Sequence, residues 1–523
     1  MKKSIFILGS FLISFFNFLN AQQTLDTLNG NSISAIINDR GRLFNNPQLG
    51  RAGYEFPAGS GNHLIFSGGF WFGGTNQNGD LKLAAFGYNG YDFYSGPYSS
   101  TNSYSDLDYS NDYLSSIWSV KKSDILHHIS NYNQQGYVAP DGILNWPGNG
   151  DPSIGVAEQL APYIDENNNG IYEPHLGEYP CIKGDEASYQ IMHEDLANGQ
   201  SGGQEIGAEI HIMVYQYQSL NFIDSTTFME VKVFNRGQNS YNDFKASIYM
   251  DPDIGFSEDE YIGSTPTKNL VYAYNADNFD EGGNGVPGYG ANPPAIGIVS
   301  LNKDFEYFWY LQRSTISLLS DYWNSMNGRN SDGSFWSHGI TGATTQFLYD
   351  GVPGLGTGWT EMNIDGNGTA NPMGDRSFIA TSIEETFNPG DTLIYNSAII
   401  VNRQGDHLEN VQGLINYADS VQNYFNANNS DCSSNISLGL TEEFQFGKLE
   451  IYPNPATNQI TIVWNEVRMD VIKITSYNGR VVKVIPLNGE NSIKGEKIIN
   501  LNGFSSGVYF VNIGDKVKKL VIQ

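Results

Sequence analysis

Residues 449–464 read LEIYPNPATNQITIVW, and residues 497–523 read KIINLNGFSSGVYFVNIGDKVKKLVIQ. Apolar and polar residues alternate along both stretches, which is the period-two pattern of strands with one buried face. Asn478-Gly479 and Ser506-Gly507 are turn dipeptides that separate such segments. The end of the chain therefore predicts a small antiparallel β-sandwich.

Four groups of residues are spread along this region: Tyr452-Pro453-Asn454-Pro455, Asn478-Gly479-Arg480, Gly507-Val508-Tyr509 and Lys518-Lys519-Leu520. In order and spacing they resemble the type A C-terminal sorting domain of the type IX (Por) secretion system of Bacteroidota. The resemblance implies a sorting domain at residues 447–523 that the type IX machinery recognises and cleaves after outer-membrane passage. It also implies that the cargo is then released or linked to the cell surface.

The N-terminus has the pattern of a signal peptide. Lys2 and Lys3 precede an apolar run at residues 5–19, and Ala21 is a small residue at the expected cleavage point. The alternative is an uncleaved anchor, but the run is shorter than the roughly 20 residues that span a bilayer. We expect cleavage of residues 1–21, no membrane span in the mature protein, and export through the periplasm to the outer cell surface or the extracellular space.

The part between these two segments is strongly acidic. The whole chain has 28 Lys and Arg and 56 Asp and Glu; residues 441–523 hold 10 and 8 of them, and the leader holds 2 and none. The remaining body has 16 basic and 48 acidic residues, a net charge of −32. Such a body repels nucleic acids and anionic lipids, so both are excluded as partners.

The body, residues 22–425, is predicted to be mainly β, as one or two sandwich-like domains. Residues 206–217 and 227–235 are expected to form paired long strands, and residues 392–401 a further strand. One helix follows, with a stripe at helical spacing: Val411, Leu414, Ile415, Ala418, Val421 and Phe425. Residues 426–446, polar and rich in Asn and Ser, are the predicted linker to the sorting domain.

Aromatic residues and glycine pairs are concentrated at residues 60–97. Short strands at 64–66 and 70–72 are expected on either side of Gly68-Gly69, and Asn78-Gly79 predicts a type I′ hairpin turn. Gly pairs within strands usually mark bulges or a close backbone approach. The aromatic residues are then either packed sandwich interior or a platform for a ligand.

Residues 165–173, DENNNGIYE, match the oxygen spacing of a Ca²⁺-binding loop. The expected ligands are Asp165, Asn167, Asn169, the carbonyl of Ile171, and Asp185, with Glu178 as the alternative to Asp185. Leu176 occupies the position of the bidentate Glu of an EF-hand, so an EF-hand is excluded. A plain turn capped by its own Asx side chains is the other interpretation.

A second acidic stretch includes Asp251, Asp253 and residues 258–260. Paired carboxylates are the acid and base of glycosidases, which makes a secreted hydrolase of polysaccharides one hypothesis. Solvated loop carboxylates or a second Ca²⁺ site are the alternatives. No nucleophile-elbow, P-loop or dinucleotide motif occurs in the sequence.

The chain has two cysteines, Cys181 and Cys432. A disulfide between them would close a loop of about 250 residues and stabilise the protein by roughly 5 kcal/mol on the chain-entropy model. Two separate thiols are the alternative. Neither cysteine has the spacing of a metal ligand.

Blocks such as residues 68–74 (GGFWFGG) and 250–255 (MDPDIG) resemble a group of large secreted Bacteroidota proteins with the same sorting domain. That resemblance implies export and names no activity. We predict a non-enzymatic binding or adhesion protein with Ca²⁺-stabilised loops and a glycan or surface ligand, and the alternative is the hydrolase. A cleft with two facing carboxylates would favour the enzyme, and a filled interior with convergent oxygen ligands would favour the binder.

Overall fold

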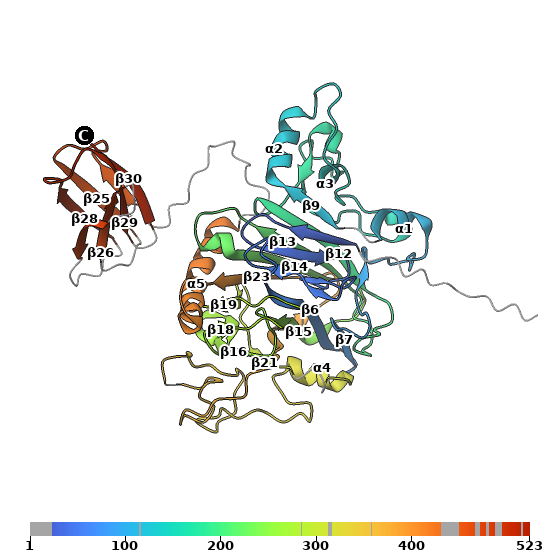
Figure 1. The fold of residues 1–523 in the computed structure, drawn as a ribbon. Coiled ribbons are helices and arrows are strands. Elements are labelled where there is room, and N and C mark those ends of the chain that lie inside the picture. The colour runs from blue at the N-terminus through green and yellow to red at the C-terminus, as the bar shows by residue number, and fades with distance from the viewer. Residues whose placement is uncertain are drawn as a thin grey trace, which may run out of the picture. The chain divides into compact units, whose positions relative to one another are not determined.

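The computed structural model describes residues 24–114, 117–283, 285–311, 316–356, 358–429, 449–465, 471–476, 481–486, 494–513 and 516–523 (Figure 1). The chain divides into two units, Met1–Ser434 and Asn435–Gln523, and this division falls within the predicted linker. The predicted signal peptide, residues 1–21, lies outside the described residues. No helix among those residues is long and apolar enough to cross a membrane.

The first sheet of the body has eight strands in the order β1-β2-β5-β6-β15-β22-β21, with β7 beside β6, and its pairs are antiparallel. The strands are β1 (Leu25–Leu28), β2 (Ser34–Asn38), β5 (Tyr54–Glu55), β6 (His63–Asn76), β7 (Leu81–Ala85), β15 (Tyr241–Pro252), β21 (Tyr307–Tyr310) and β22 (Phe378–Phe387).

The second sheet has nine strands in the order β16-β17-β20-β23-β14-β13-β12-β8, with β9 beside β12, and is also antiparallel. The strands are β8 (Tyr94–Ser95), β9 (Trp118–Lys121), β12 (Glu186–Glu194), β13 (Ala208–Gln216), β14 (Thr226–Asn235), β16 (Glu260–Thr265), β17 (Leu270–Asn275), β20 (Ala295–Ser300) and β23 (Thr392–Asn402).

Strand β14 shows why the two sheets pack as a sandwich. Met229, Val231 and Val233 belong to a core shared with the first sheet, while Phe228 on the opposite face belongs to a second core. Successive side chains of a strand point to opposite faces, so a strand with apolar residues on both faces is buried between two layers. The predicted pairing of residues 206–217 with 227–235 is confirmed as β13 with β14.

The second core lies between the outer face of the second sheet and a cover made of helices and loops. The cover includes α5 (His407–Asn428), which packs along β17, β20 and β23, and all six residues of its predicted apolar stripe are buried. Its last turn extends three residues into the predicted linker, to Asn428.

The other helices are α1 (Leu107–Tyr113), α2 (Lys122–Asn131), α3 (Asp141–Leu144) and α4 (Leu319–Met326), with short 3₁₀ turns η1 (Pro152–Ile154), η2 (Pro174–Leu176), η3 (Phe222–Ser225) and η4 (Pro266–Lys268). Three two-stranded pairs join β3 (Asn45–Asn46) to β4 (Arg51–Ala52), β10 (Tyr163–Ile164) to β11 (Tyr179–Pro180), and β18 (Phe279–Asp280) to β19 (Gly290–Ala291).

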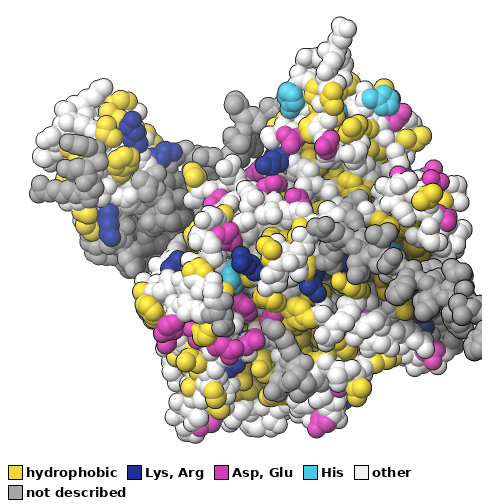
Figure 2. Space-filling model, turned by 45° about the vertical axis from the view of Figure 1, so that its right-hand side comes forward, with side chains coloured by type: hydrophobic (Ala, Val, Ile, Leu, Met, Phe, Trp, Pro, Cys, Tyr) yellow, Lys and Arg dark blue, Asp and Glu magenta, His cyan; other side chains and the backbone are white. Residues whose placement is uncertain are grey.

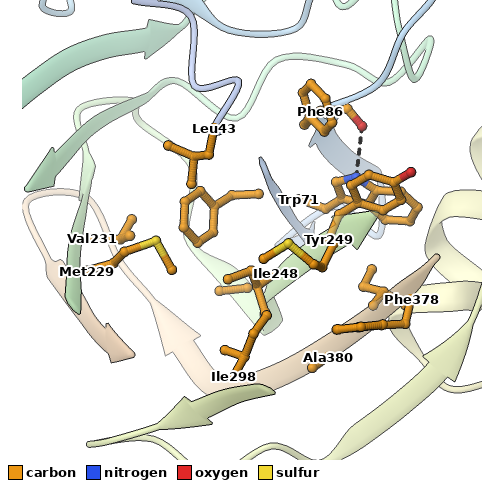
Figure 3. Packing of buried hydrophobic residues seen from close by; sticks show 14 of the residues in the cluster. Leu43, Trp71, Phe86, Met229, Val231, Ile248, Tyr249, Ile298, Phe378 and Ala380 are labelled. Carbon is orange, nitrogen blue, oxygen red and sulfur yellow. Dashed lines mark hydrogen bonds between the residues drawn. The ribbon is translucent and has the colours of Figure 1, made fainter. Parts of the chain in front are cut away.

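The prediction of two short strands around Gly68-Gly69 is wrong, because β6 runs unbroken from His63 to Asn76. Its glycines allow close packing: a Cβ on Gly69 would lie 2.3 Å from Cγ of Phe86. Trp71 is 3% exposed, stacks on Tyr249, and donates its indole N–H to the Phe86 carbonyl at 2.9 Å (Figure 3). Phe70, Trp71 and Phe72 of β6 are therefore sandwich interior and not a ligand platform, whereas Tyr88 and Tyr91, later in the same segment, are exposed.

The prediction of a type I′ turn at Asn78-Gly79 is also wrong. Strands β6 and β7 pair up to Thr75 and Leu81, so the loop has five residues, and of the dipeptide only Gly79 has a positive φ, 87°. The Asn76 side chain accepts the amide N–H groups of Asn78 and Asp80, both at 2.9 Å. An Asx-type loop thus replaces the tight turn, whose two central residues would both need positive φ.

The sorting unit is a sandwich of a three-stranded and a four-stranded antiparallel sheet, which confirms the predicted fold. The strands are β24 (Leu449–Tyr452), β25 (Gln459–Asn465), β26 (Val471–Ser476), β27 (Val481–Pro486), β28 (Lys494–Asn500), β29 (Gly507–Ile513) and β30 (Lys516–Ile522). Ile460, Ile462 and Ile474 are fully buried in a core of its own. The body and the sorting unit therefore share no sheet among the described residues.

Candidate functional site

The predicted Ca²⁺ loop lies in the cover of the second sheet. Asp165 accepts the amides of Asn169 and Gly170 at 3.2 and 2.8 Å, and the Asn169 side chain accepts the amide of Ile171 at 2.8 Å. The Asn167 side chain likewise accepts the Asn169 amide at 3.0 Å. The amide of Gly170 holds the pKa of Asp165 below its usual value, so this carboxylate is ionised. These are the bonds of an Asx-capped turn.

The two residues proposed to complete the Ca²⁺ shell differ in position. Glu178 is fully buried; its Oε2 accepts the Glu173 amide at 2.6 Å, while its Oε1 has no hydrogen-bond partner. Its bond to the Glu173 amide places the carboxyl group beside the loop. Burial raises the pKa of Glu178, and the charges of Asp165 and Glu173 raise it further. Asp185 instead accepts the amide of Gln218 at 3.0 Å. Ca²⁺ at the loop stays a prediction, with Glu178 as the better-placed ligand.

A cavity of about 290 Å³ opens beside this loop. Its floor is the outer face of the second sheet, where Tyr189 of β12, His211 of β13, and Lys232 and Phe234 of β14 lie together. Its wall is the segment before the loop: Gln159, Leu160, Ala161, Pro162, Tyr163 and Asp165. The wall comes from residues 159–165 and the floor from residues 189–234 on three different strands, so the sequence alone did not indicate the cavity.

Buried polar groups hold the floor in place. The Tyr189 hydroxyl and Nδ1 of His211 share a hydrogen bond of 2.8 Å, and the His211 ring packs on Phe234 with centroids 4.8 Å apart. Behind them, Glu209 is paired with Arg236 at 2.6 Å. Burial alone would raise the pKa of Glu209, but His211 and Arg236 outweigh it and bring this pKa to about 2. Glu209 is therefore the anion of a buried ion pair with Arg236.

The second acidic stretch lies at the end of β15, away from this cavity. Asp251 is fully buried and accepts the Tyr88 hydroxyl at 2.6 Å. Glu260, at the start of β16, accepts the Ile254 amide at 3.0 Å. Asp375 joins Asp251 and Asp253, with one carboxylate oxygen from each lying within 4.8 Å of the others. Asp375 was not singled out in the sequence, because nothing local links it to β15.

Acidic side chains are dispersed over the one face of the body that Figure 2 draws. On the face drawn in Figure 2, Asp and Glu occupy several separate places over the body and form no single large patch. This matches their scatter along the sequence, where they alternate with Gly, Asn and aromatic residues. Binding sites are therefore expected at particular clusters of side chains and not over a general acidic surface.

Cys181 is buried and disulfide-bonded. Cys432, the other cysteine of the chain, lies outside the described residues. A free thiol is therefore excluded at Cys181. Its pairing with Cys432 stays a prediction.

In the sorting unit, the first and last motif groups touch each other. The Asn454 side chain donates to the Lys519 carbonyl at 2.7 Å and accepts the Val521 amide at 2.9 Å. Lys518 and Lys519 are exposed on β30, and so is Tyr452 at the end of β24. Pro453 and Pro455, on either side of Asn454, both follow cis peptide bonds. The Tyr509 hydroxyl bonds the Ser505 carbonyl at 2.8 Å, and Gly479 lies outside the described residues.

Residues 450–523 match the family described as the secretion system C-terminal sorting domain. The chain is thus a cargo protein of the type IX secretion system, and the sorting domain implies export to the cell surface or the extracellular space. The chain is also 35% identical over 88 residues to beta-agarase A of Zobellia galactanivorans, a match that covers 16% of this chain and 15% of the agarase. A match of this extent leaves the function of the body open.

Three solved structures show a weak likeness. A polysaccharide lyase is 9% identical over 60% of this chain and 34% of its own, with a TM-score of 0.16. A putative aldose 1-epimerase of Escherichia coli K12 is 9% identical over 73% of this chain and 100% of its own, with a TM-score of 0.25. Heparan sulfate lyase HepC of Pedobacter heparinus is 10% identical over 73% and 36%, with a TM-score of 0.21. At these TM-scores the likeness supports no conclusion about the body.

Proposed function

We propose that the body is a non-enzymatic binding protein that holds one sugar residue of a glycan in the cavity beside the Asp165 loop. The observation that carries the proposal is the make-up of the cavity. Two half-buried aromatic side chains, Tyr163 and Phe234, line it together with the amide of Gln159, the carboxylate of Asp165 and the ammonium of Lys232.

These groups match the two chemical faces of a sugar. The C–H face of a sugar ring is apolar and packs on aromatic side chains, whose bodies are large and rigid. Its hydroxyl groups both donate and accept, so they need acceptors such as Asp165 and donors such as Lys232, and Gln159 supplies both. At about 290 Å³ the cavity is at the small end of ligand sites and suits a single ring.

The hydrolase is the less favoured function because the cavity lacks its machinery. A glycosidase needs two carboxyl groups on either side of the scissile bond, one of them a proton donor with a raised pKa. Asp165 is the one carboxylate among the residues that line the cavity, and its pKa is lowered. Glu209, behind the floor, is held ionised by Arg236 and His211.

Ca²⁺ at the Asp165 loop belongs to the same proposal, as a support for the cavity wall. The buried Oε1 of Glu178, which has no hydrogen-bond partner, supports it. So does the pKa of Glu178, which burial raises and which the Asp165 and Glu173 charges raise further. A hard cation such as Ca²⁺ takes carboxylate and carbonyl oxygens and would relieve this repulsion.

A glycan array run in parallel with a reducing-sugar assay tests the function. We expect the purified chain to bind one class of polysaccharide without releasing reducing ends. Replacement of Tyr163 by Ala should weaken this binding by about tenfold or more, since aromatic anchors contribute most of the affinity of such sites.

The matched control is Phe335→Ala, which removes an aromatic side chain that is 52% exposed and does not line the cavity. Its affinity should equal that of the unaltered chain. Release of reducing ends by the unaltered chain would contradict the non-enzymatic function. Equal binding by Tyr163→Ala would show that the glycan is held elsewhere.

A further inference from the structure

We infer that Arg40 and Arg42 form a binding site for the carboxylate or sulfate group of a sugar, separate from the cavity beside the Asp165 loop. The two side chains line one small depression of the body, together with Phe86 and Tyr91. Both arginines are half-buried, so they are partly enclosed by the protein and still open to solvent. The site extends the proposed glycan binding to a second place on the body.

The two arginines have few partners within the protein. No hydrogen bond among the described residues uses the Arg40 guanidinium group, which lies over the Tyr91 ring, 4.8 Å from its centroid. Arg42 donates from Nη2 to the Gly87 carbonyl at 3.3 Å. Since each guanidinium group carries five N–H donors, the pair has most of its donors left for a ligand.

Aromatic side chains hold the guanidinium groups in position. Arg42 lies over the rings of Phe86 and Tyr88, 5.4 and 5.5 Å from their centroids, which is within cation–π distance. Phe86 is itself fixed, because its carbonyl accepts the Trp71 indole N–H (Figure 3). The Tyr88 hydroxyl in turn donates to Asp251 at 2.6 Å. Contact through the face of a guanidinium group leaves its N–H edge open to an acceptor.

One carboxylate, Asp92, also lines the depression, and the backbone occupies its oxygens. Asp92 is 1% exposed. It accepts the amide N–H groups of Ala85 at 2.9 Å, Gln200 at 2.7 Å and Ser201 at 3.2 Å. No ion pair among the described residues includes Asp92 or either arginine. The positive charge of the two guanidinium groups therefore has no paired carboxylate.

The depression has room for one small group. Its volume is about 10 Å³, roughly that of a single water. An oxygen of an anionic group can enter it, and guanidinium groups bind such oxygens through short, charge-assisted hydrogen bonds. The rest of the ligand stays outside, where Tyr88 and Tyr91 are 36% and 44% exposed. Exposed aromatic side chains suit the apolar C–H face of a sugar ring.

The overall charge of the body restricts the ligand further. The body has a net charge of −32, which repels a polyanion such as a nucleic acid. A sugar with one charged group is repelled much less, and salt at 0.1 M screens charges that are more than about 10 Å away. We therefore expect a sugar with a single acidic substituent, which is either a uronic acid or a sulfate ester.

The test compares galactose, galacturonate and galactose 6-sulfate, which share one ring and differ only in the group at C6. Ligand-observed NMR titration of the full chain gives their dissociation constants, with inorganic sulfate as a fourth probe. We expect at least one charged sugar to bind about tenfold more tightly than galactose, because its charged group adds hydrogen bonds to the contacts of the ring. It should also bind more tightly than inorganic sulfate. The better of the two charged sugars distinguishes the carboxylate from the sulfate.

Variants locate the site. Arg40→Gln and Arg42→Gln should each reduce this preference for a charged sugar by about tenfold, to the affinity of galactose. Their thermal unfolding should stay close to that of the unaltered chain, because neither arginine belongs to an ion pair. Arg40→Lys keeps the charge without the planar fork and should lose part of the affinity.

Two control variants accompany them. Arg51→Gln changes an exposed arginine that does not line the depression, so it should leave the preference unchanged. Tyr163→Ala, at the other cavity, should also keep the preference, which separates a failure of this site from a failure of the proposed function.

Equal affinities for galactose and both charged sugars, in the unaltered chain and in Tyr163→Ala, would overturn the inference. So would a preference that persists in the double variant Arg40→Gln/Arg42→Gln, or one that falls as much in Arg51→Gln. Inorganic sulfate bound as tightly as the better charged sugar would show that the ring contributes nothing and would overturn the assignment to a sugar.

Discussion

Deletion of residues 448–523 is expected to abolish release of the protein and to leave the body in the periplasm. The sorting unit has its own core and shares no described sheet with the body, so its loss should not unfold the body. The machinery, however, recognises cargo through this domain. The measurement is immunoblotting of medium, cell surface and periplasm in a bacterium with a type IX system.

The control is the full chain with the same epitope tag, together with a cytoplasmic marker for lysis. A milder variant is Asn454→Ala, which removes both bonds between the first motif and β30 and should reduce release. An unchanged amount of the truncated body in the medium would contradict the sorting assignment.

Replacement of Arg376 by Met is expected to destabilise the body by about 3–5 kcal/mol, because it leaves a buried carboxylate without its cation. Glu361 is 1% exposed and binds Arg376 through both carboxylate oxygens. It also accepts the amide of Ile262 at 2.8 Å and so ties the segment before β22 to β16. Chemical unfolding in EDTA measures the loss independently of any bound cation.

The same change at an exposed pair gives the matched control. Lys268 pairs with Asp419, whose side chain is 65% exposed, and Lys268→Met should cost less than about 1 kcal/mol. Addition of Glu361→Gln to Arg376→Met should recover part of the loss, since the buried charge is removed. Equal costs for Arg376→Met and Lys268→Met would show that the buried pair does not stabilise this region.

The elements predicted well from the sequence are those whose pattern is complete within one segment. The alternation in β14 and the apolar stripe of α5 are each set by local periodicity, so strand, helix and buried face followed directly. The glycines of β6 led to a wrong prediction, because a strand break and a close approach of another side chain to the backbone give the same local pattern. Only the position of Phe86 against Gly69 decides between them.

The candidate sites were predictable only in part, for the same reason. The Asp165 loop is a local motif and was found, whereas the cavity beside it needs β12, β13 and β14 to lie against residues 159–165. Asp251 and Asp253 were noticed as an acidic stretch. Their partner Asp375 is 122 residues further on and becomes adjacent only because β22 pairs with β15.

The central claim is that the sorting unit is a transferable export signal attached to a separately folded body. The most direct measurement is to fuse residues 435–523 to an unrelated periplasmic reporter enzyme and to assay that enzyme outside cells that contain a type IX system. The account predicts reporter activity at the cell surface or in the medium, and none there in a strain that lacks the system. Retention of the fusion inside the cells, with the native chain still exported, would contradict it.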